Sequence, residues 1–272
     1  MTAGRPDATL RSVTTTTDEL RKRLTLPQFP RSAGYDPMWM LANAMGPNPL
    51  WLAEALTARM RLRPGTRVLD LGCGRAITSV FLAREFGVDV VAADLWIKPS
   101  ENWPRIVEAG VPDRVLPVHA EAHDLPFAHG CFDAVVSLDA YHYFGTDELY
   151  LGYLRQFVRP GGQLGIAVPM VTAELTEPPE HLRRFWEWDF WSFHSADWWR
   201  HHWAKTGLVD VQVAEPIPDS WRHWLLWDEV SLQTGTSPLP DRAEQVIEMI
   251  RIDAGRTLTL GLVVATRPDT GG

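Results

Sequence analysis

The sequence predicts an α/β fold in which a mostly parallel sheet carries helices on both faces. Short apolar runs of strand length alternate with segments whose apolar residues recur at helical spacing, as in strand 67–71, helix 75–86 and strand 88–93. A glycine turn directly follows the first strand, and an acid closes the second. Strands that are buried on both faces read as continuous apolar runs, so the alternation indicates parallel strands joined by helices.

The other elements follow from the same patterns, taken in chain order. Two helices are predicted before the sheet, over 36–44 and 49–61. After strand 88–93 we expect these elements in chain order: helix 101–109, strand 114–118, strand 132–137, helix 146–158, strand 162–168, strand 207–213 and strand 258–266. Residues 1–34 have little periodic apolar sequence and are predicted to be a flexible arm with one short helix. The domain is therefore expected to span 35–272.

Composition excludes several classes of protein. With 45% hydrophobic and 22% charged residues the chain is typical of a soluble globular domain, and its net charge of −8 disfavours nucleic acid as a partner. Cys73 and Cys131 are too few for a disulfide framework or a zinc site, and no apolar run is long enough for a signal peptide or a membrane span. Only 3 of the 26 basic residues are lysine, which is typical of a GC-rich bacterial genome. We expect a cytoplasmic protein. The sequence does not decide whether it forms a homodimer.

The glycine turn predicts a nucleoside-binding site. Gly72 and Gly74 let the backbone approach a ligand closely, and Asp70 and Asp94 end adjacent strands where open α/β sheets bind ligands. The dinucleotide fingerprint needs a third glycine where this chain has Ile77. An acid before the turn would also repel a pyrophosphate. A cationic cofactor without phosphates, such as S-adenosylmethionine, suits this turn better than NAD.

These motifs resemble those of class I S-adenosylmethionine-dependent methyltransferases of the small-molecule and cyclopropane-fatty-acid-synthase-like branch. The resemblance covers about 35–215 and the last strand, and implies a Rossmann-like sheet of seven strands with an antiparallel last strand. It also implies that the first acid and the glycines line the methionine part of the cofactor, that the second acid binds the ribose, and that Glu121 and Ala122 hold the adenine. The cofactor residues implied are Asp70, Gly72, Gly74, Asp94, Leu95, Glu121, Ala122 and Asp139. Two departures are Glu121 in place of the commoner Asp, and Arg75-Ala76 where many relatives have glycine.

The segment 137–145 is the best candidate for chemistry, because such enzymes place residues facing the transferred methyl after the fourth strand. Methyl transfer is an in-line displacement, so the protein chiefly aligns the nucleophile and excludes water. His142 is the candidate base, since its ordinary pKa suits proton transfer near neutrality. Asp139 and Tyr141 are expected to orient groups, and Tyr143 to contact substrate. In the alternative interpretation, His142 packs beside the methionine moiety and exchanges no proton.

Two insertions, 170–205 and 216–256, are predicted to form a helical cap over the site. They hold nine of the thirteen tryptophans: Trp186, Trp188, Trp191, Trp198, Trp199, Trp203, Trp221, Trp224 and Trp227. Most are expected to pack the cap against the sheet, while Trp186 and Trp191 are the first candidates for substrate contact. No metal is expected, because adjacent His201 and His202 point to different faces of a helix.

The sequence therefore predicts an enzyme that moves a methyl group from S-adenosylmethionine to N, O, S or C of a small molecule. Two alternatives stay open. The chain could bind S-adenosylmethionine as a sensor or partner-recruiting module, or it could be an NAD-dependent oxidoreductase on the same architecture. Fold analogy does not supply the acceptor.

Overall fold

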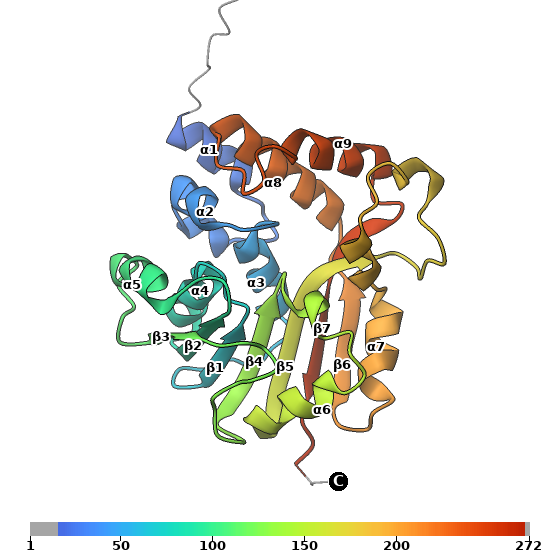
Figure 1. The fold of residues 1–272 in the computed structure, drawn as a ribbon. Coiled ribbons are helices and arrows are strands. Elements are labelled where there is room, and N and C mark those ends of the chain that lie inside the picture. Colours follow the sequence, from blue (N-terminus) through green and yellow to red (C-terminus); the bar gives the residue numbers. More distant parts are fainter. Residues whose placement is uncertain (1–15, 270–272) are drawn as a thin grey trace, which may run out of the picture.

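The computed structural model describes residues 16–269, whose strands form one mixed sheet (Figure 1). The strand order is β3-β2-β1-β4-β5-β7-β6, and only β7 runs antiparallel to its neighbours. The strands are β1 (Arg67–Leu71), β2 (Asp89–Asp94), β3 (Val115–His119), β4 (Phe132–Leu138), β5 (Val158–Val171), β6 (Asp210–Pro216) and β7 (Leu258–Thr266). The predicted seven-stranded sheet with an antiparallel last strand is confirmed.

Helices cover both faces of the sheet and form two core layers. One layer includes α1 (Thr17–Leu24), α2 (Pro37–Asn43), α3 (Pro49–Thr57), α4 (Ile77–Phe86), α5 (Pro99–Glu108), α8 (Ser220–Thr234) and α9 (Ala243–Asp253). The other includes α6 (Tyr150–Leu154) and α7 (Ala196–Ala204). Strand β7 is buried on both faces of the sheet. Leu260 and Leu262 pack in the first layer, whereas Val263 and Ala265 pack in the second.

Residues 16–34, part of the segment predicted to be an arm with one short helix, contain the short helix α1 and pack against the domain. Leu20 and Leu24, one helical turn apart on α1, are 1% and 3% exposed, and the Phe29 ring stacks on Trp51. Thr16 and Glu19 form a capping box at the start of the helix. A few apolar residues are enough to hold this segment in place, because the rest of the core provides the side chains that they pack against. The predicted arm's residues 1–15 lie outside the described residues.

Two predicted elements differ in length from the observed ones. The expected helix 146–158 is only α6 followed by a 3₁₀ turn, η3 (Arg155–Phe157). Strand β5 begins at Val158 instead of 162, because Val158 pairs with Phe132 and the backbone N–H of Gly161 donates to the Arg267 carbonyl. The early start of β5 results from pairing with segments that are distant in the sequence. The pattern of apolar residues within 158–168 carries no information about that pairing.

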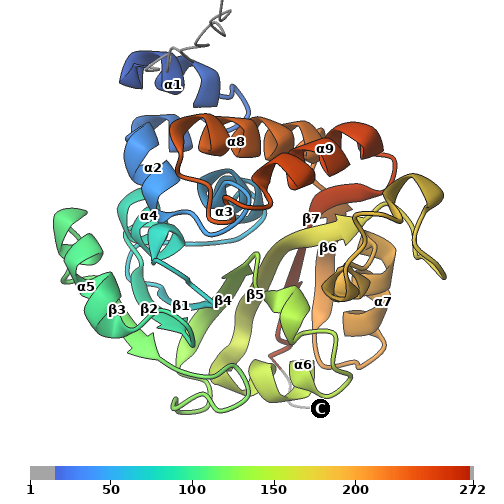
Figure 2. The ribbon, with the colours of Figure 1, turned by 45° about the horizontal axis from the view of Figure 1, so that its top comes forward.

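The insertion 216–256 lies at the end of the sheet where β1, β2 and β4 terminate, whereas the helix that closes the insertion 170–205 packs beside β6 (Figure 2). The segment 170–205 contains the 3₁₀ turns η4 (Glu180–Leu182) and η5 (Trp188–Ser192) and then α7, while 216–256 contains α8 and α9. Trp199, Trp203 and Trp227 have no exposed surface, so these three pack the structure as expected. Within residues 16–269, every helix falls short of the length and apolarity that crossing a membrane would require.

Candidate active site

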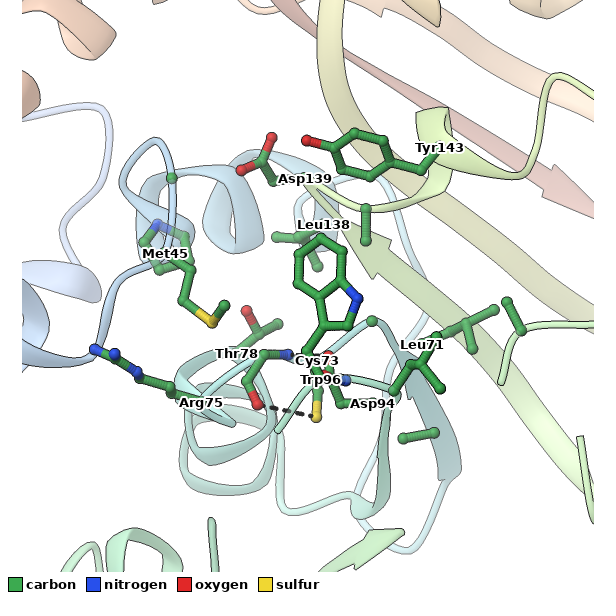
Figure 3. Close-up of a pocket in the computed structure, with 18 of the residues that line it drawn as sticks. Met45, Leu71, Cys73, Arg75, Thr78, Asp94, Trp96, Leu138, Asp139 and Tyr143 are labelled. Carbon is green, nitrogen blue, oxygen red and sulfur yellow. Dashed lines mark hydrogen bonds between the residues drawn. The ribbon is translucent and has the colours of Figure 1, made fainter. Parts of the chain in front are cut away.

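A cavity of about 340 Å³ opens at the carboxyl ends of β1, β2 and β4 (Figure 3). The turn after β1 forms one wall, with Gly72 and Gly74. Asp94 follows from β2 and Asp139 from β4. The loop between α2 and α3, with Met45 at its centre, closes another side. The volume lies in the range of roughly 300–1,000 Å³ that is common for small-molecule sites.

The glycine turn has the conformation that its residue types predict. Gly72 and Gly74 have φ of +74° and +51°, in the left-handed region that favours glycine. A Cβ on Gly72 would overlap the Cβ of Ala140, and one on Gly74 would lie 2.9 Å from the Met45 Sδ atom. Ala76, just before α4, also has a left-handed φ of 59°. The absent side chains therefore make room at the cavity wall.

Asp94 organises two loops and faces the cavity. Its Oδ2 atom accepts from the Gly74 N–H at 2.7 Å, and its Oδ1 atom accepts from the N–H groups of Trp96 and Ile97 at 2.8 Å each. A carboxylate has about four acceptor positions. The remaining one is available to a hydroxyl of a ligand.

Asp70 lies beneath the glycine turn and is not among the side chains that line the cavity. Its Oδ2 atom accepts from the Ser79 hydroxyl of α4 at 2.6 Å, while Oδ1 has no hydrogen-bond partner. Burial raises the pKa of Asp70 to about 7, against the effect of the Ser79 bond, and the charge of Asp94 adds to the rise. In this structure Asp70 links β1 to α4 and does not reach the cavity.

Glu121, Ala122 and Leu95 line the cavity beside the β2 and β3 ends. Both Glu121 carboxylate oxygens contact His123, one at its backbone N–H and one at Nδ1, each at 2.8 Å. The His123 side-chain bond is the main cause that lowers the Glu121 pKa. The Ala122 carbonyl accepts from the Tyr150 hydroxyl. Glu121 is thus held as an anion at the cavity rim.

His142 and Tyr141 are buried and are not among the residues that line the cavity. They are 1% and 0% exposed, and the His142 ring lies 4.0 Å from the Tyr143 ring centroid. Burial lowers the pKa of His142 to about 3, and its Nδ1 atom has no partner. The segment forms a 3₁₀ turn, η2 (Tyr141–Tyr143), in which residues three apart share a face, so Ala140 and Tyr143 line the cavity together. The predicted base is therefore shielded from any ligand there.

Asp139 and Tyr143 are the polar groups that this segment presents to the cavity, and Figure 3 shows the Tyr143 hydroxyl directed toward the Asp139 carboxylate. Asp139 has a left-handed φ of 52°, and its N–H donates to the Ala167 carbonyl of β5 at 2.8 Å. Burial raises the pKa of Asp139 to about 7, with a further contribution from the charge of Asp228. Burial, then Asp139 and Asp189, raise the pKa of Tyr143 to about 12. Strained backbone of this kind is common at functional sites.

Several cavity residues were not predicted from sequence. Met45 and Trp96 come from short irregular loops, where no periodicity signals a function, although Trp96 follows Asp94 by only two positions. Conversely, Trp186 and Trp191 are not among the residues that line the cavity, and their rings contact each other with centroids 5.4 Å apart. In the described part of the chain, no group of three or more His, Cys, Asp or Glu side chains is placed to hold a metal.

Residues 68–162 match the family described as "Methyltransferase domain". The chain is 31% identical over 116 residues to 27-O-demethylrifamycin SV methyltransferase of Amycolatopsis mediterranei, which aligns 42% of this chain with 43% of that enzyme. The chain therefore spans less than half of that relative.

Solved structures extend the similarity over most of the fold. Phosphoethanolamine N-methyltransferase 2 of Haemonchus contortus, in complex with S-adenosyl-L-methionine, superposes with a TM-score of 0.68 at 18% identity, over 92% of this chain and 60% of that one. The [4+2]-cyclase SpnF superposes with a TM-score of 0.64 at 17% identity, over 81% and 82%. The resemblance to class I S-adenosylmethionine-dependent methyltransferases is confirmed, and the names of these two proteins indicate that the fold carries more than one chemistry.

Proposed function

We propose that this chain, whose residues 68–162 form a methyltransferase domain on a class I methyltransferase fold, transfers a methyl group from S-adenosylmethionine to a small-molecule acceptor. One observation carries the proposal. The glycine turn and Asp94 form one side of a single cavity, and Asp139 and Tyr143 face it from β4. The names of the rifamycin relative and of the S-adenosylmethionine complex support the donor and the reaction.

The residues present fit this donor. Gly72 lines the cavity with its backbone, which would lie against the methionine part of the molecule, and a side chain there would overlap Ala140. Asp94 keeps one acceptor direction for a ribose hydroxyl, and Glu121 with Ala122 would hold the adenine. When bound, the donor supplies an electrophilic methyl group on a sulfonium. Asp70 would act through the turn that it supports.

The chain's own contribution is alignment, exclusion of water and removal of a proton. Asp139 lines the cavity and has a pKa of about 7, so its carboxylate is partly ionised at neutral pH and can accept a proton from the acceptor. Tyr143 keeps its proton at that pH and can donate a hydrogen bond that orients the acceptor. In this proposal Asp139 takes the role that the sequence suggested for His142, because His142 does not reach the cavity.

A competing function is binding of S-adenosylmethionine without methyl transfer, because a protein with this fold is named a [4+2]-cyclase and not a methyltransferase. Incubation with methyl-labelled S-adenosylmethionine and a panel of amines, phenols, alcohols and thiols separates the two. Labelled product supports the proposal. Binding of S-adenosylmethionine without methyl transfer to any of these acceptor classes supports the competing function. Binding of NAD in place of S-adenosylmethionine would support the oxidoreductase hypothesis.

We also propose a bacterial, cytoplasmic protein that does not bind nucleic acid, while the possible homodimer is left to measurement. Support comes from arginine in place of lysine at nearly all basic positions and from the net charge of −8. Fractionation of source cells tests the location, a nucleic-acid shift assay tests the absence of nucleic-acid binding, and light scattering of the purified protein measures the oligomeric state.

A further inference from the structure

We propose that Trp227 is a positioning residue for the methyl transfer, which holds Gly46 against the carboxylate of Asp139 and so sets how that carboxylate faces the acceptor. This role rests on the function proposed above, in which Asp139 takes a proton from the acceptor. It adds a residue of the cap helix α8, which lies outside the matched domain.

Gly46 lies in direct contact with the Asp139 carboxylate. A Cβ on Gly46 would overlap the Asp139 Oδ2 atom and lie 3.2 Å from its Cγ atom, so the carboxylate occupies the space of the missing side chain. Gly46 has no left-handed φ, and its backbone conformation therefore does not call for glycine. The close approach of Asp139 is what requires a glycine at this position.

Packing holds the Asp139 carboxylate in its orientation. Within residues 16–269, burial and the charge of Asp228 act on this carboxylate, and no hydrogen bond is among the influences on it. A carboxylate without a hydrogen bond turns about its side-chain bonds unless its neighbours prevent it. The Oδ2 atom lies against Gly46, whereas Oδ1 is 3.9 Å from the position of the absent Cβ. The contact therefore leaves Oδ1 as the less obstructed oxygen.

Trp227 fixes the position of Gly46 from the cap. Its Nε1–H donates to the Gly46 carbonyl at 3.0 Å, and its side chain has no exposed surface. The indole also packs edge-on against Trp51 of α3, with ring centroids 5.9 Å apart. Because α3 begins directly after the loop 44–48, one buried indole contacts both the loop and the helix behind it. The bond to Gly46 thus links α8 to the carboxylate.

The loop 44–48 also reaches the donor side of the cavity, through Met45. The Met45 Sδ atom lies 2.9 Å from the position that a Cβ on Gly74 would take. A methionine side chain is flexible and can keep such a contact when its backbone moves slightly. A small displacement of Gly46 should therefore affect Asp139 more than the binding of the donor.

A carbon-13 NMR titration tests the contact without an acceptor. The aspartate carboxyl carbons are labelled, and the signal of Asp139 is the one that Asp139→Asn removes. In the unmodified protein this carboxyl group should titrate with a pKa of about 7. Trp227→Phe keeps a ring but loses the N–H, so the loop is released, water reaches the carboxylate, and the pKa of Asp139 should fall toward 3.8.

Trp51→Phe is the matched control for this titration. Trp51 is 3% exposed and packs on Trp227, but its Nε1 atom has no hydrogen-bond partner in residues 16–269. The substitution removes the same atoms and no bond, so the pKa of Asp139 should stay where it is. Both variants keep Tyr143 and Asp228, the other ionisable groups whose charges act on Asp139 or respond to it.

A kinetic measurement uses the compound that the unmodified protein methylates from the panel of amines, phenols, alcohols and thiols. Trp227→Phe should lower kcat roughly 10–100-fold and change the affinity for S-adenosylhomocysteine less than about threefold, as expected for a misplaced group. In a protein that already carries Asp139→Asn, Trp227→Phe should lower kcat less than about twofold further, because the group through which it acts is gone.

Gly46→Ala tests the same contact if Trp227→Phe does not fold. The added methyl group displaces the carboxylate directly, so kcat should fall while S-adenosylhomocysteine still binds. Gly34→Ala is its control. Gly34 also lacks a left-handed φ, and no atom lies within 4 Å of its added Cβ, so kcat should be unchanged.

The outcomes separate this role from the proposed function. If the unmodified protein neither binds S-adenosylhomocysteine nor methylates any compound of the panel, the proposed function is wrong, and the NMR titration still reports whether Trp227 acts on Asp139. An unchanged titration of Asp139 in Trp227→Phe overturns the positioning role, and so does an equal shift in Trp51→Phe. An equal loss of kcat from Trp227→Phe with and without Asp139 also overturns it, because Trp227 would then act elsewhere.

Discussion

The Gly74 N–H donates to the Asp94 Oδ2 atom at 2.7 Å, which joins the turn after β1 to the end of β2. Asp94 is only 8% exposed and also binds the backbone at Trp96 and Ile97. One carboxylate therefore fixes the shape of two cavity walls. Its replacement should affect both the loops and the ligand that they hold.

Asp94→Ala should weaken binding of S-adenosylhomocysteine by about 1.5–3 kcal/mol, because it removes charge-assisted hydrogen bonds. Asp94→Asn should cost less, since its amide oxygen can still accept from Trp96 and Ile97. Calorimetric titration measures both. Asp89→Asn, at the opposite end of β2, is the control and should bind normally.

Gly72→Ala should abolish detectable cofactor binding, because the new methyl group would push Ala140 and the start of η2 out of place. Gly65→Ala separates this overlap from backbone strain. Gly65 also has a positive φ, of +80°, but no atom lies within 4 Å of its added Cβ. Titration with S-adenosylhomocysteine and a melting curve should show lower stability in both variants and lost binding only in the first. Equal binding in the two would refute the steric argument.

Asp139→Asn should lower kcat by about 10²–10⁴-fold while S-adenosylhomocysteine still binds, as expected for loss of a general base. Because the base must be ionised, kcat of the unmodified enzyme should rise with pH to a plateau above a pKa of about 7, and this rise should vanish in the variant. His142→Phe fills the same buried space and should keep most of the activity. A large, pH-dependent loss in His142→Phe would restore the histidine as the base.

Trp96→Ala should raise KM for the acceptor and leave cofactor affinity nearly unchanged, because the indole lines the cavity with most of its surface exposed. Trp191→Ala is the comparison. Trp191 is 44% exposed but lies outside the cavity lining, so KM should change less than twofold. Steady-state kinetics at saturating donor distinguish the two, and the opposite ranking would return Trp191 to the substrate site.

Asp228→Asn should raise the melting temperature at pH 8 but not at pH 4. The pKa of Asp228 is about 7 in the folded protein and 3.8 as the ordinary value, so the folded state binds its proton more tightly. The contribution of Asp228 to the free energy of unfolding is therefore greatest below about pH 4. It falls as the pH rises to about 7 and is constant above that. Burial and the charge of Asp228 also raise the pKa of Asp139, so the titration of Asp139 adds in the same direction. Scanning calorimetry at both pH values checks this, and an equal shift at both would contradict it.

The sequence predicted the parts of this molecule that depend on local pattern. The bounds of β1 and β7 agree with the prediction, and so do the positive φ angles at Gly72 and Gly74. Apolar strands and glycine turns depend on residues that are adjacent in the sequence. The direction of His142 depends on a 3₁₀ turn at the end of β4 and on the core behind it. Sequence spacing alone did not distinguish His142 from Tyr143, one position later.

The place of Asp228 could not be predicted for a different reason. Its neighbour on α8, Trp227, bonds to Gly46, and these two residues are 181 positions apart in the chain. Met45 likewise lines the cavity because α8 and the loop between α2 and α3 meet above the sheet. Contacts of this kind arise from the packing of whole elements.

The bond between Trp227 and Gly46 joins two segments that both lie outside the matched domain 68–162. Gly72, Asp94 and Glu121, the residues proposed to hold the donor, lie inside it. The cap helix α8 can therefore vary separately from the matched domain only as long as the loop at 44–48 varies with it. In a chimera, α8 grafted from a relative without its matching loop at 44–48 would lose this anchor. The two segments should be transplanted together if the cap is to keep its place beside the cavity.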